Sequence, residues 1–231
     1  MRPAEKPEIA ALPLFTSMGA EQRERIFAAS FLQVFPPMLT LFEHEQRPDF
    51  LHILVDGMVE LFTTNGDRET TMALIRPVRS FILAAAYIDQ PYLMSARTVV
   101  ASRIMLIPAP LIRQVIDEDR ALMRGAMTEL SIGFRQFVRA LTDMKLRQSV
   151  ERLGNFLLEE SGALNNVSQF ELPVEKRTLA SLLGMTPENL SRGIAVLGQH
   201  GATISGNSVR ITDRAKLETF ARPDAILSED F

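Results

Sequence analysis

The chain has 231 residues, enough for one large domain or two modest ones, each with its own core. Its 46% hydrophobic and 23% charged residues are typical of a globular protein, and its longest apolar runs, such as Phe81–Tyr87, are too short to span a bilayer. The absence of cysteine excludes disulfides, thiolate zinc sites, cysteine-ligated iron–sulfur clusters and thiol nucleophiles. A formal net charge of −3 disfavours non-specific binding along the length of a nucleic acid. It does not exclude a small, locally basic surface that contacts nucleic acid.

The N-terminal segment lacks the features of a signal peptide. Met1–Glu8 alternates in charge, contains two prolines and has no apolar core, so we expect a cytoplasmic protein. Residues 9–30 then predict a short helical lead-in. Its expected apolar anchors are Ile9, Leu12, Leu14, Ile26 and Phe27.

From Phe31 to about Pro108 the pattern changes to short strands separated by turn signals. Asp56-Gly57 and Asn65-Gly66 are dipeptides typical of close hairpins. Because no helical pattern interrupts these runs, they predict an antiparallel barrel or sandwich. The expected strands are Phe31–Phe35, Leu39–Phe42, Phe50–Val55, Met58–Phe62 and Thr70–Ile75, followed by a strand pair formed by Ser95–Val100 and Arg103–Ile107.

A long helical segment follows from Pro110 to about Met144. Its bulky apolar residues alternate in spacing between four and three, which is a heptad pattern. Such a narrow stripe needs a partner, either the β-domain of the same chain or the same helix of a second copy across a dimer axis. The dimer is the interpretation we favour, because the stripe persists for six steps. Its residues are Met123, Met127, Leu130, Phe134, Phe137, Leu141 and Met144.

A second helix, Ser149–Glu160, is predicted after the polar joint Lys145–Gln148, and Ser161-Gly162 is expected to end it. We expect this joint to act as a hinge between a sensing half and a C-terminal half.

The segment Leu172–Ile211 predicts a helix-turn-helix. A short helix before Gly184 is followed by a second helix with Thr186 as N-cap and Pro187 in its first position. Ala180 is small enough for two helices to cross closely, and Leu190 anchors the second helix in the core. Gly184 supplies the positive φ that the tight turn requires.

The second helix carries side chains suited to reading base edges. Arg192 can donate two hydrogen bonds to a guanine, and Glu188 can accept one from a cytosine. Asn189 and Ser191 complete the expected contacts, beside the N-cap Thr186. Ala202–Ser205 and Ser208–Ile211 flank Gly206-Asn207 as a two-stranded wing, and Lys176, Arg177 and Arg210 are candidate phosphate contacts. The alternative is a winged helix used only for protein contact.

With these motifs in order, nearly the whole chain resembles the CRP/FNR family of transcription regulators. The resemblance implies an α+β protein with an N-terminal antiparallel β-barrel of the cyclic-nucleotide-binding jelly-roll type, a long dimerisation helix and a C-terminal winged helix-turn-helix. It implies the divisions 9–118 for effector sensing, 119–144 for dimerisation and 145–231 for DNA binding. It also implies a homodimer, double-stranded DNA and RNA polymerase as partners, and no membrane.

The recognition segment Glu188–Arg192 matches the FNR branch, whose recognition helix carries Glu-x-x-Ser-Arg. That similarity implies a palindromic operator related to TTGAT–N4–ATCAA, with one half-site per subunit. Gly193 departs from the family, because a bulky apolar residue is usual there, and this puts local stability in doubt.

The effector domain departs further. Cyclic-nucleotide binders of the family carry a Gly-Glu pair and, eleven residues later, an Arg-Ser/Thr-Ala element. Leu83 and Ala84 stand in place of the pair, and Met94 replaces the arginine before Ser95. A cyclic phosphate would be buried without a cation, so we expect no cyclic AMP binding. Arg97 should point to the opposite face from Met94.

The same departures predict an apolar pocket, which resembles that of DNR- and FtrB-type regulators, some of them similar to haem-based nitric oxide sensors. The expected lining is Phe81, Leu83, Ala84, Tyr92, Met94 and Ser95, with Ile82, Tyr87 and Leu93 beside them and Phe134 and Phe137 from the long helix. Haem needs an axial ligand, commonly histidine. Of His44, His52 and His200, His52 is the weak candidate, since it alternates with Leu51 and Ile53 and can face either way. A small hydrophobic effector, or none, remains open.

An enzyme is not expected. The sequence contains no phosphate-binding glycine loop, nucleophile elbow or metal-spaced cluster. A second alternative is a regulatory or scaffold subunit that uses the barrel and the coiled coil but binds no DNA.

Overall fold

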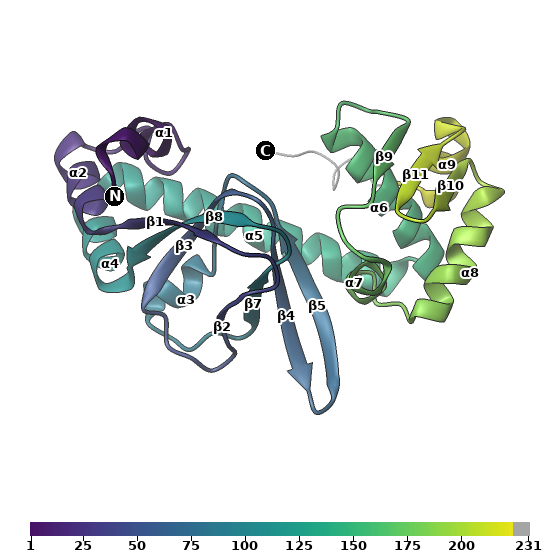
Figure 1. The fold of residues 1–231 in the computed structure, drawn as a ribbon, viewed down its shortest axis with the longest axis horizontal. Helices are drawn as coiled ribbons and strands as arrows, with labels where there is room; N and C mark the ends of the chain where they lie inside the picture. Colours follow the sequence, from purple (N-terminus) through teal and green to yellow (C-terminus); the bar gives the residue numbers. More distant parts are fainter. Residues whose placement is uncertain (224–231) are drawn as a thin grey trace. The chain divides into compact units, whose positions relative to one another are not determined.

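The computed structural model describes residues 1–223, and by its contacts the chain divides between Phe134 and Arg135 into two compact units. Figure 1 traces the elements from the N-terminus to the C-terminal helix. The sequence-based division into 9–118, 119–144 and 145–231 stays a prediction. The long helix belongs to both units, because it runs from Arg120 to Leu146.

The N-terminal unit is built on two four-stranded antiparallel sheets, ordered β1-β8-β3-β6 and β2-β7-β4-β5. This arrangement confirms the jelly-roll fold, with two packed sheets in place of a closed barrel. The strands are β1 (Phe31–Phe35), β2 (Thr40–Phe42), β3 (Phe50–Asp56), β4 (Val59–Asn65), β5 (Arg68–Ile75), β6 (Arg79–Phe81), β7 (Ser95–Thr98) and β8 (Ser102–Pro108).

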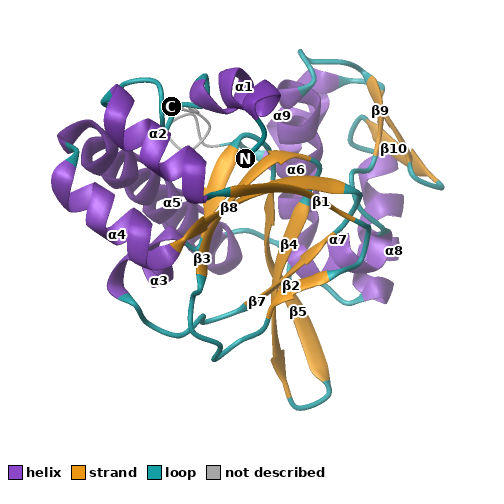
Figure 2. Cartoon of the chain, turned by 60° about the vertical axis from the view of Figure 1, so that its left-hand side comes forward, coloured by secondary structure: helices purple, strands orange, loops and turns teal. Residues whose placement is uncertain are grey.

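Helices cover one face of the first sheet, as Figure 2 shows for α2, α4 and α5. Alternation along β3 divides its side chains between two cores. Leu51 and Ile53 pack against the helices, whereas Leu54 lies between the sheets. All the predicted anchors of the helical lead-in are buried. The helices of this unit are η1 (Pro3–Glu5), α1 (Lys6–Ala10), α2 (Ala20–Ala29), α3 (Leu83–Ile88), α4 (Ala109–Glu118) and the first half of α5 (Arg120–Leu146).

One of the two predicted hairpins is a crossover between sheets. Asn65-Gly66 does close the β4–β5 hairpin, but β3 and β4 flank Gly57 and lie in different sheets. The proposed pairing of Ser95–Val100 with Arg103–Ile107 is wrong for the same reason, since β7 and β8 also lie in different sheets. The two crossovers pack together. A Cβ at Gly57 (φ +99°) would lie 2.7 Å from Cα of Ser102.

The segment between β6 and β7 contains a short helix, α3, that the strand pattern did not predict. Its start is a strained position, because Ile82 takes a left-handed conformation with φ 59°. Such a conformation costs a β-branched residue about 1–3 kcal/mol. The strand β6 was missed as well, since three residues are too few to show alternation.

The predicted long helix is interrupted at Asp119, where the backbone is extended. The Asp119 carboxylate accepts hydrogen bonds from the backbone N–H groups of Ala121 (2.8 Å) and Leu122 (2.9 Å) and so caps the start of α5. Its other oxygen accepts from the N–H of Gly19 at 2.9 Å. A second helix can therefore start afresh without a glycine or proline signal.

The central element of the C-terminal unit is α6 (Ser149–Ala163), which packs against α8 and α9. The sequence predicted that Ser161-Gly162 would end α6, but the helix continues to Ala163. Ser161 faces inward, and its hydroxyl donates to the carbonyl of Val167 at 2.8 Å. The predicted wing is part of a three-stranded sheet, and two elements of the unit were missed, β9 and α9. The elements are β9 (Gln169–Glu171), α7 (Lys176–Leu182), α8 (Pro187–Gly198), β10 (Ala202–Ser205), β11 (Ser208–Ile211) and α9 (Arg214–Ala221). Among the described residues, no helix is long and apolar enough to cross a membrane.

Candidate nucleic-acid interface and effector region

The turn between α7 and α8 has the geometry that the helix-turn-helix motif requires. Gly184 has φ +60°, and the N–H of Met185 donates to the carbonyl of Ala180 at 2.8 Å. A Cβ at Gly184 would lie 2.4 Å from Cε of Met144, the last residue of the apolar stripe on α5. Glycine is needed here for its positive φ, and its small size leaves room for the Met144 side chain.

The start of α8 is capped as predicted. The Thr186 hydroxyl accepts from the N–H of Asn189 at 3.2 Å, and Pro187 occupies the first helical position. The pKa of Glu188 is lowered by its own backbone N–H, by the Thr186 hydroxyl and by Arg192. Glu188 is therefore held as an acceptor at the positive end of the helix.

The outer face of α8 presents four polar side chains from its first two turns. Leu190, Gly193 and Leu197 are buried on the inner face. The Ser191 hydroxyl donates to the carbonyl of Pro187 at 3.0 Å, and the Arg192 guanidinium donates to the Asn189 side chain. These two hydrogen bonds restrict the side-chain conformations of Ser191 and Arg192 on the exposed face. The exposed set is Glu188, Asn189, Ser191 and Arg192, with the exposed Thr186 next to it.

The candidate phosphate contacts lie on α7 and β11 of the C-terminal unit. Lys176 and Arg177 begin α7, where Lys176 is partly exposed and Arg177 is exposed. Arg210 is exposed on β11 and donates to the Gln169 side chain at 3.4 Å. A long contact of this kind leaves most guanidinium donors available to a phosphate.

Gly193 is buried, and the space that a larger residue would occupy is filled from neighbouring elements. A Cβ there would meet Cε of Met185 at 3.4 Å and Cδ2 of Leu153 at 3.5 Å, which are ordinary contacts. Because glycine is the less favourable residue in a helix interior, Gly193→Ala should raise the free energy of unfolding by about 0.5–1 kcal/mol. Chemical denaturation measures this change. A clear loss of stability would show that Met185 and Leu153 cannot accommodate one methyl group.

The predicted effector residues do not gather in one place, and all of them except Phe137 belong to the N-terminal unit. Phe81, Tyr92 and Met94 join the core between the sheets, whereas Leu83 joins the core under the helices. Ser95 is buried, and its hydroxyl accepts from the N–H of His44 at 3.0 Å. Ala84, Tyr87 and Leu93 are exposed, and so are Phe134 and Phe137 on α5.

Arg97 belongs to an ionic network that the sequence did not reveal. Its guanidinium donates to Glu60 at 2.7 Å and to both oxygens of Glu69, at 2.7 and 3.1 Å, and lies 4.3 Å from the Phe62 ring centroid. The Thr71 hydroxyl donates to Glu60 at 2.6 Å. This cation is therefore committed to two carboxylates and does not replace the arginine that Met94 displaces.

His52 faces the core between the sheets, where it packs against two aromatic rings. Its ring centroid lies 5.1 Å from that of Phe42 and 5.3 Å from that of Phe81, and Tyr92 stacks on Phe42 at 4.0 Å. Within the described residues, Nδ1 of His52 has no hydrogen-bond partner. His52 is only 6% exposed, so a haem could reach this imidazole only if the core between the sheets opened.

The other two histidines fit haem no better. His44 is in an exposed turn beside Glu45. His200 stacks on Phe220 at 4.0 Å in the C-terminal unit. The described residues therefore do not fit a histidine-ligated haem in this arrangement.

The burial of His52 makes stability depend on pH. Loss of hydration lowers its pKa from 6.5 to about 4. Between these values the unfolded chain binds a proton that the folded chain does not, so the free energy of unfolding falls as pH falls through this window. At pH 4 the loss should reach about 3 kcal/mol. His52→Leu should remove this part of the acid sensitivity in denaturation curves collected from pH 7 to 4, and an unchanged profile would contradict the assignment.

The apolar stripe on α5 lies mostly open to solvent. Leu130 is partly buried against the helix-side core. Met123, Met127 and Phe134, the other members in the N-terminal unit, are exposed and do not pack under its sheets, which argues against the single-chain alternative. The exposed fractions along the stripe are 42% for Met123, 59% for Met127, 68% for Phe134, 59% for Phe137, 43% for Leu141 and 48% for Met144.

Comparisons with known proteins match both halves of the chain. A cyclic nucleotide-binding domain model matches residues 32–119, and a Crp-like helix-turn-helix domain model matches residues 151–220. The nitrogen fixation regulation protein FixK of Azorhizobium caulinodans is 26% identical over 195 residues, 80% of this chain and 76% of that protein. A putative cAMP-binding regulatory protein from Silicibacter pomeroyi is 26% identical, with TM-score 0.61 over 96% of this chain and 100% of that chain. FixK2 from Bradyrhizobium japonicum shares the fold, with TM-score 0.73 at 18% identity over 83% of this chain and 96% of that chain.

The two matched domains occur in the order that the structure shows, with α5 between them. The FixK relative is named as a regulation protein. The match to a Crp-like helix-turn-helix domain supports the expectation of a regulator in place of an enzyme. A jelly roll, a long helix and a winged helix-turn-helix with an exposed, capped second helix agree with that description. The chain belongs to the CRP/FNR family of DNA-binding transcription regulators.

Proposed function

We propose that the protein is a homodimeric, sequence-specific regulator that reads a palindrome related to TTGAT–N4–ATCAA with one α8 per half-site. The observation that carries this proposal is the exposed face of α8, on which Glu188 and Arg192 stand one turn apart beside a capped helix start. An acceptor and a bidentate donor in this order suit a cytosine and a guanine edge. Lys176, Arg177 and Arg210 would fix the register through phosphates.

Dimerisation is proposed from the α5 stripe. An exposed row of large apolar residues at heptad spacing is costly in water and is stabilised by an equivalent row from a second copy. Two-fold symmetry in the protein would match the two-fold symmetry of the palindrome. A cytoplasmic location and a contact with RNA polymerase are part of the same proposal.

The effector is proposed to be something other than a cyclic nucleotide. Leu83 is buried in an apolar core, Ala84 offers no charge, and Met94 supplies no cation for a phosphate. Arg97 is occupied by Glu60 and Glu69. A small hydrophobic ligand near the aromatic residues Phe81 and Tyr92 remains the proposal, since no described histidine is placed to ligate haem.

The test is binding of purified full-length protein to a fluorescent palindromic duplex, measured by anisotropy over a range of salt concentrations. We expect binding that weakens steeply with salt and exceeds binding to a scrambled duplex by about 10³-fold or more. Added cyclic AMP should leave the affinity unchanged, and the protein should show no Soret band. Equal affinity for palindrome and scrambled duplex would overturn sequence-specific reading, and no binding to either duplex would favour the scaffold alternative.

A further inference from the structure

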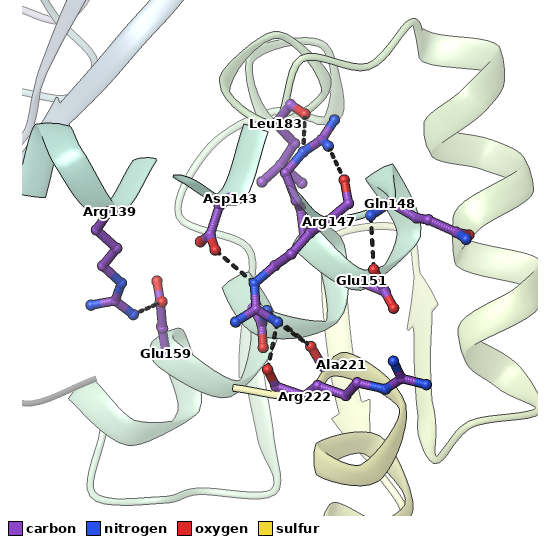
Figure 3. Close-up of polar contacts among 11 residues, drawn as sticks. Arg139, Asp143, Arg147, Gln148, Glu151, Glu159, Leu183, Ala221 and Arg222 are labelled. Atoms are coloured by element: carbon purple, nitrogen blue, oxygen red, sulfur yellow. Dashed lines mark hydrogen bonds and ion pairs between the residues drawn. The ribbon is translucent and has the colours of Figure 1, made fainter. Parts of the chain in front are cut away.

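The joint between α5 and α6 is two residues long, and its backbone is held by side chains. Only Arg147 and Gln148 separate the two helices. The N–H of Gln148 donates to the Glu151 carboxylate at 2.8 Å, which closes a capping box at the start of α6. Figure 3 shows these residues together with the arginines around them.

Arg147 reaches from the joint to the end of α9. Its Nε donates to Asp143 at 2.6 Å, and its Nη1 donates to the backbone carbonyls of Ala221, at 2.8 Å, and Arg222. The amide of Asn155 on α6 donates to the same Ala221 carbonyl at 3.1 Å. The Arg147 side chain is only 15% exposed, so these bonds are partly shielded from water.

Arg152 makes the corresponding connection to the helix-turn-helix. Its Nε donates to the carbonyl of Leu183 at 3.0 Å, and its Nη1 donates to the carbonyl of Arg147 at 2.7 Å. Leu183 is the C-cap of α7 and stands immediately before Gly184. Burial lowers the pKa of Arg152, which reflects a guanidinium drawn partly out of water.

Both arginines therefore cap the C-terminal end of a helix. The last carbonyls of a helix lack intrahelical partners and carry partial negative charge, so a guanidinium stabilises them more than it would a neutral loop. Arg147 caps α9, and Arg152 caps α7. An apolar contact supplements them, because Met144 lies against the glycine of the α7–α8 turn.

We infer that Arg147 and Arg152 are positioning residues for DNA reading, which fix the C-terminal turns of α5, the α5–α6 joint and the α7–α8 turn as one block. The inference rests on the proposed function. In this arrangement the joint Lys145–Gln148 is a fixed connection and does not act as the hinge that the sequence predicted. The recognition helix α8 then takes its orientation from the last turns of α5, where the proposed dimer seam ends.

This role concerns the separation of two recognition helices more than the contacts that each makes. We call the hydrogen bonds of Arg147 and those of Arg152 the two clamps. A dimer in which both clamps are intact holds its two α8 helices at one distance and so accepts one half-site spacing. Without the clamps, each α8 keeps its own base contacts but the pair tolerates several spacings. A merely structural role would lower stability without changing this tolerance.

The experiment compares full-length wild type with the double variant Arg147→Met/Arg152→Met on duplexes whose TTGAT half-sites are separated by three, four, five or six base pairs. Wild type should prefer its best spacer to the next by about tenfold or more, and the double variant by less than about threefold. Arg139→Met is the matched control, since Arg139 on α5 pairs with Glu159 on α6, away from the ends of α7 and α9. It should retain the wild-type ratio.

Two outcomes separate the inference from the proposed function. Wild type that binds no palindrome would defeat the proposed function, whereas a double variant with the wild-type spacing ratio would overturn the inference alone. A loss in Arg139→Met as large as in the double variant would also overturn it. If the double variant does not fold, the single variants Arg147→Lys and Arg152→Lys, which keep the charge but lose the planar fork, should show the reduced ratio.

Hydrogen exchange provides a readout that needs no DNA. In Arg152→Lys the amides of the α7–α8 turn should exchange at least about tenfold faster than in wild type, while those of the β10–β11 hairpin should be unchanged. If the amides of the α7–α8 turn exchanged equally slowly in both proteins, the inferred role of Arg152 would be wrong.

Discussion

Arg192→Ala should abolish operator recognition while leaving the fold intact. Arg192 is exposed, and its guanidinium donates to the Asn189 side chain on the same face of α8. A bidentate arginine–guanine contact contributes about 1–3 kcal/mol of base discrimination. Because a symmetric dimer would be deprived of two such contacts, the dissociation constant for the palindrome should rise by about 10² to 10⁴-fold. Fluorescence anisotropy with the palindromic duplex measures the change.

Two further variants show that the effect concerns base reading. Gln199→Ala, at the exposed C-terminal end of α8, should bind the palindrome like wild type. Arg177→Ala should weaken binding to all sequences alike and reduce the salt slope by about one unit for each phosphate that Arg177 neutralises. If Arg192→Ala retained wild-type affinity, the assignment of α8 as the recognition helix would be wrong.

Phe137→Glu should convert the dimer to monomers at micromolar concentration and thereby remove tight operator binding. Phe137 is 59% exposed in the single chain, and burial of one phenylalanine contributes about 1.5–3 kcal/mol. Its replacement removes two such contributions from the seam and places two carboxylates close to the symmetry axis. Sedimentation velocity of the full-length protein should show a monomer in place of the dimer.

The matched control lies on the same helix, away from the stripe. Thr128 is exposed, and its hydroxyl donates to the carbonyl of Arg124 within its own helix at 3.0 Å. Thr128→Glu adds the same charge to α5 and should remain dimeric. A dimeric Phe137→Glu protein, or a monomeric Thr128→Glu protein, would show that the stripe is not the dimer interface.

The elements that the sequence predicted well are those whose signals are local. The α7–α8 turn depends on Gly184, Thr186 and Pro187, which act within a few residues through φ, a cap hydrogen bond and a missing N–H. The β10–β11 hairpin was found with its observed bounds because Gly206-Asn207 marks the turn. The near-continuous apolar runs of β3 and β8 likewise reflect burial on two faces.

The features that were missed depend on distant partners. Strand β9 is three residues long and becomes a strand by pairing with β11. The crossovers at Gly57 and Ser102 resemble hairpin turns in sequence, and only the sheet order distinguishes them. Arg147 and Arg152 look like ordinary joint residues, because their partners at Ala221 and Leu183 lie far along the chain. The one available hint was a pair of arginines next to a short interruption between helices.

The carboxylate of Asp119 joins the starts of two helices, and this has a consequence for natural variation. A side chain at position 19 would meet Asp119 Oδ2 at 3.3 Å and the Gln22 side chain at 2.9 Å, so a larger residue there would displace the carboxylate that caps α5. In an alignment of related chains, glycine at 19 and aspartate at 119 should therefore appear and disappear together. A lineage that has lost the aspartate retains only the contact with the flexible Gln22 side chain as a constraint at the other position.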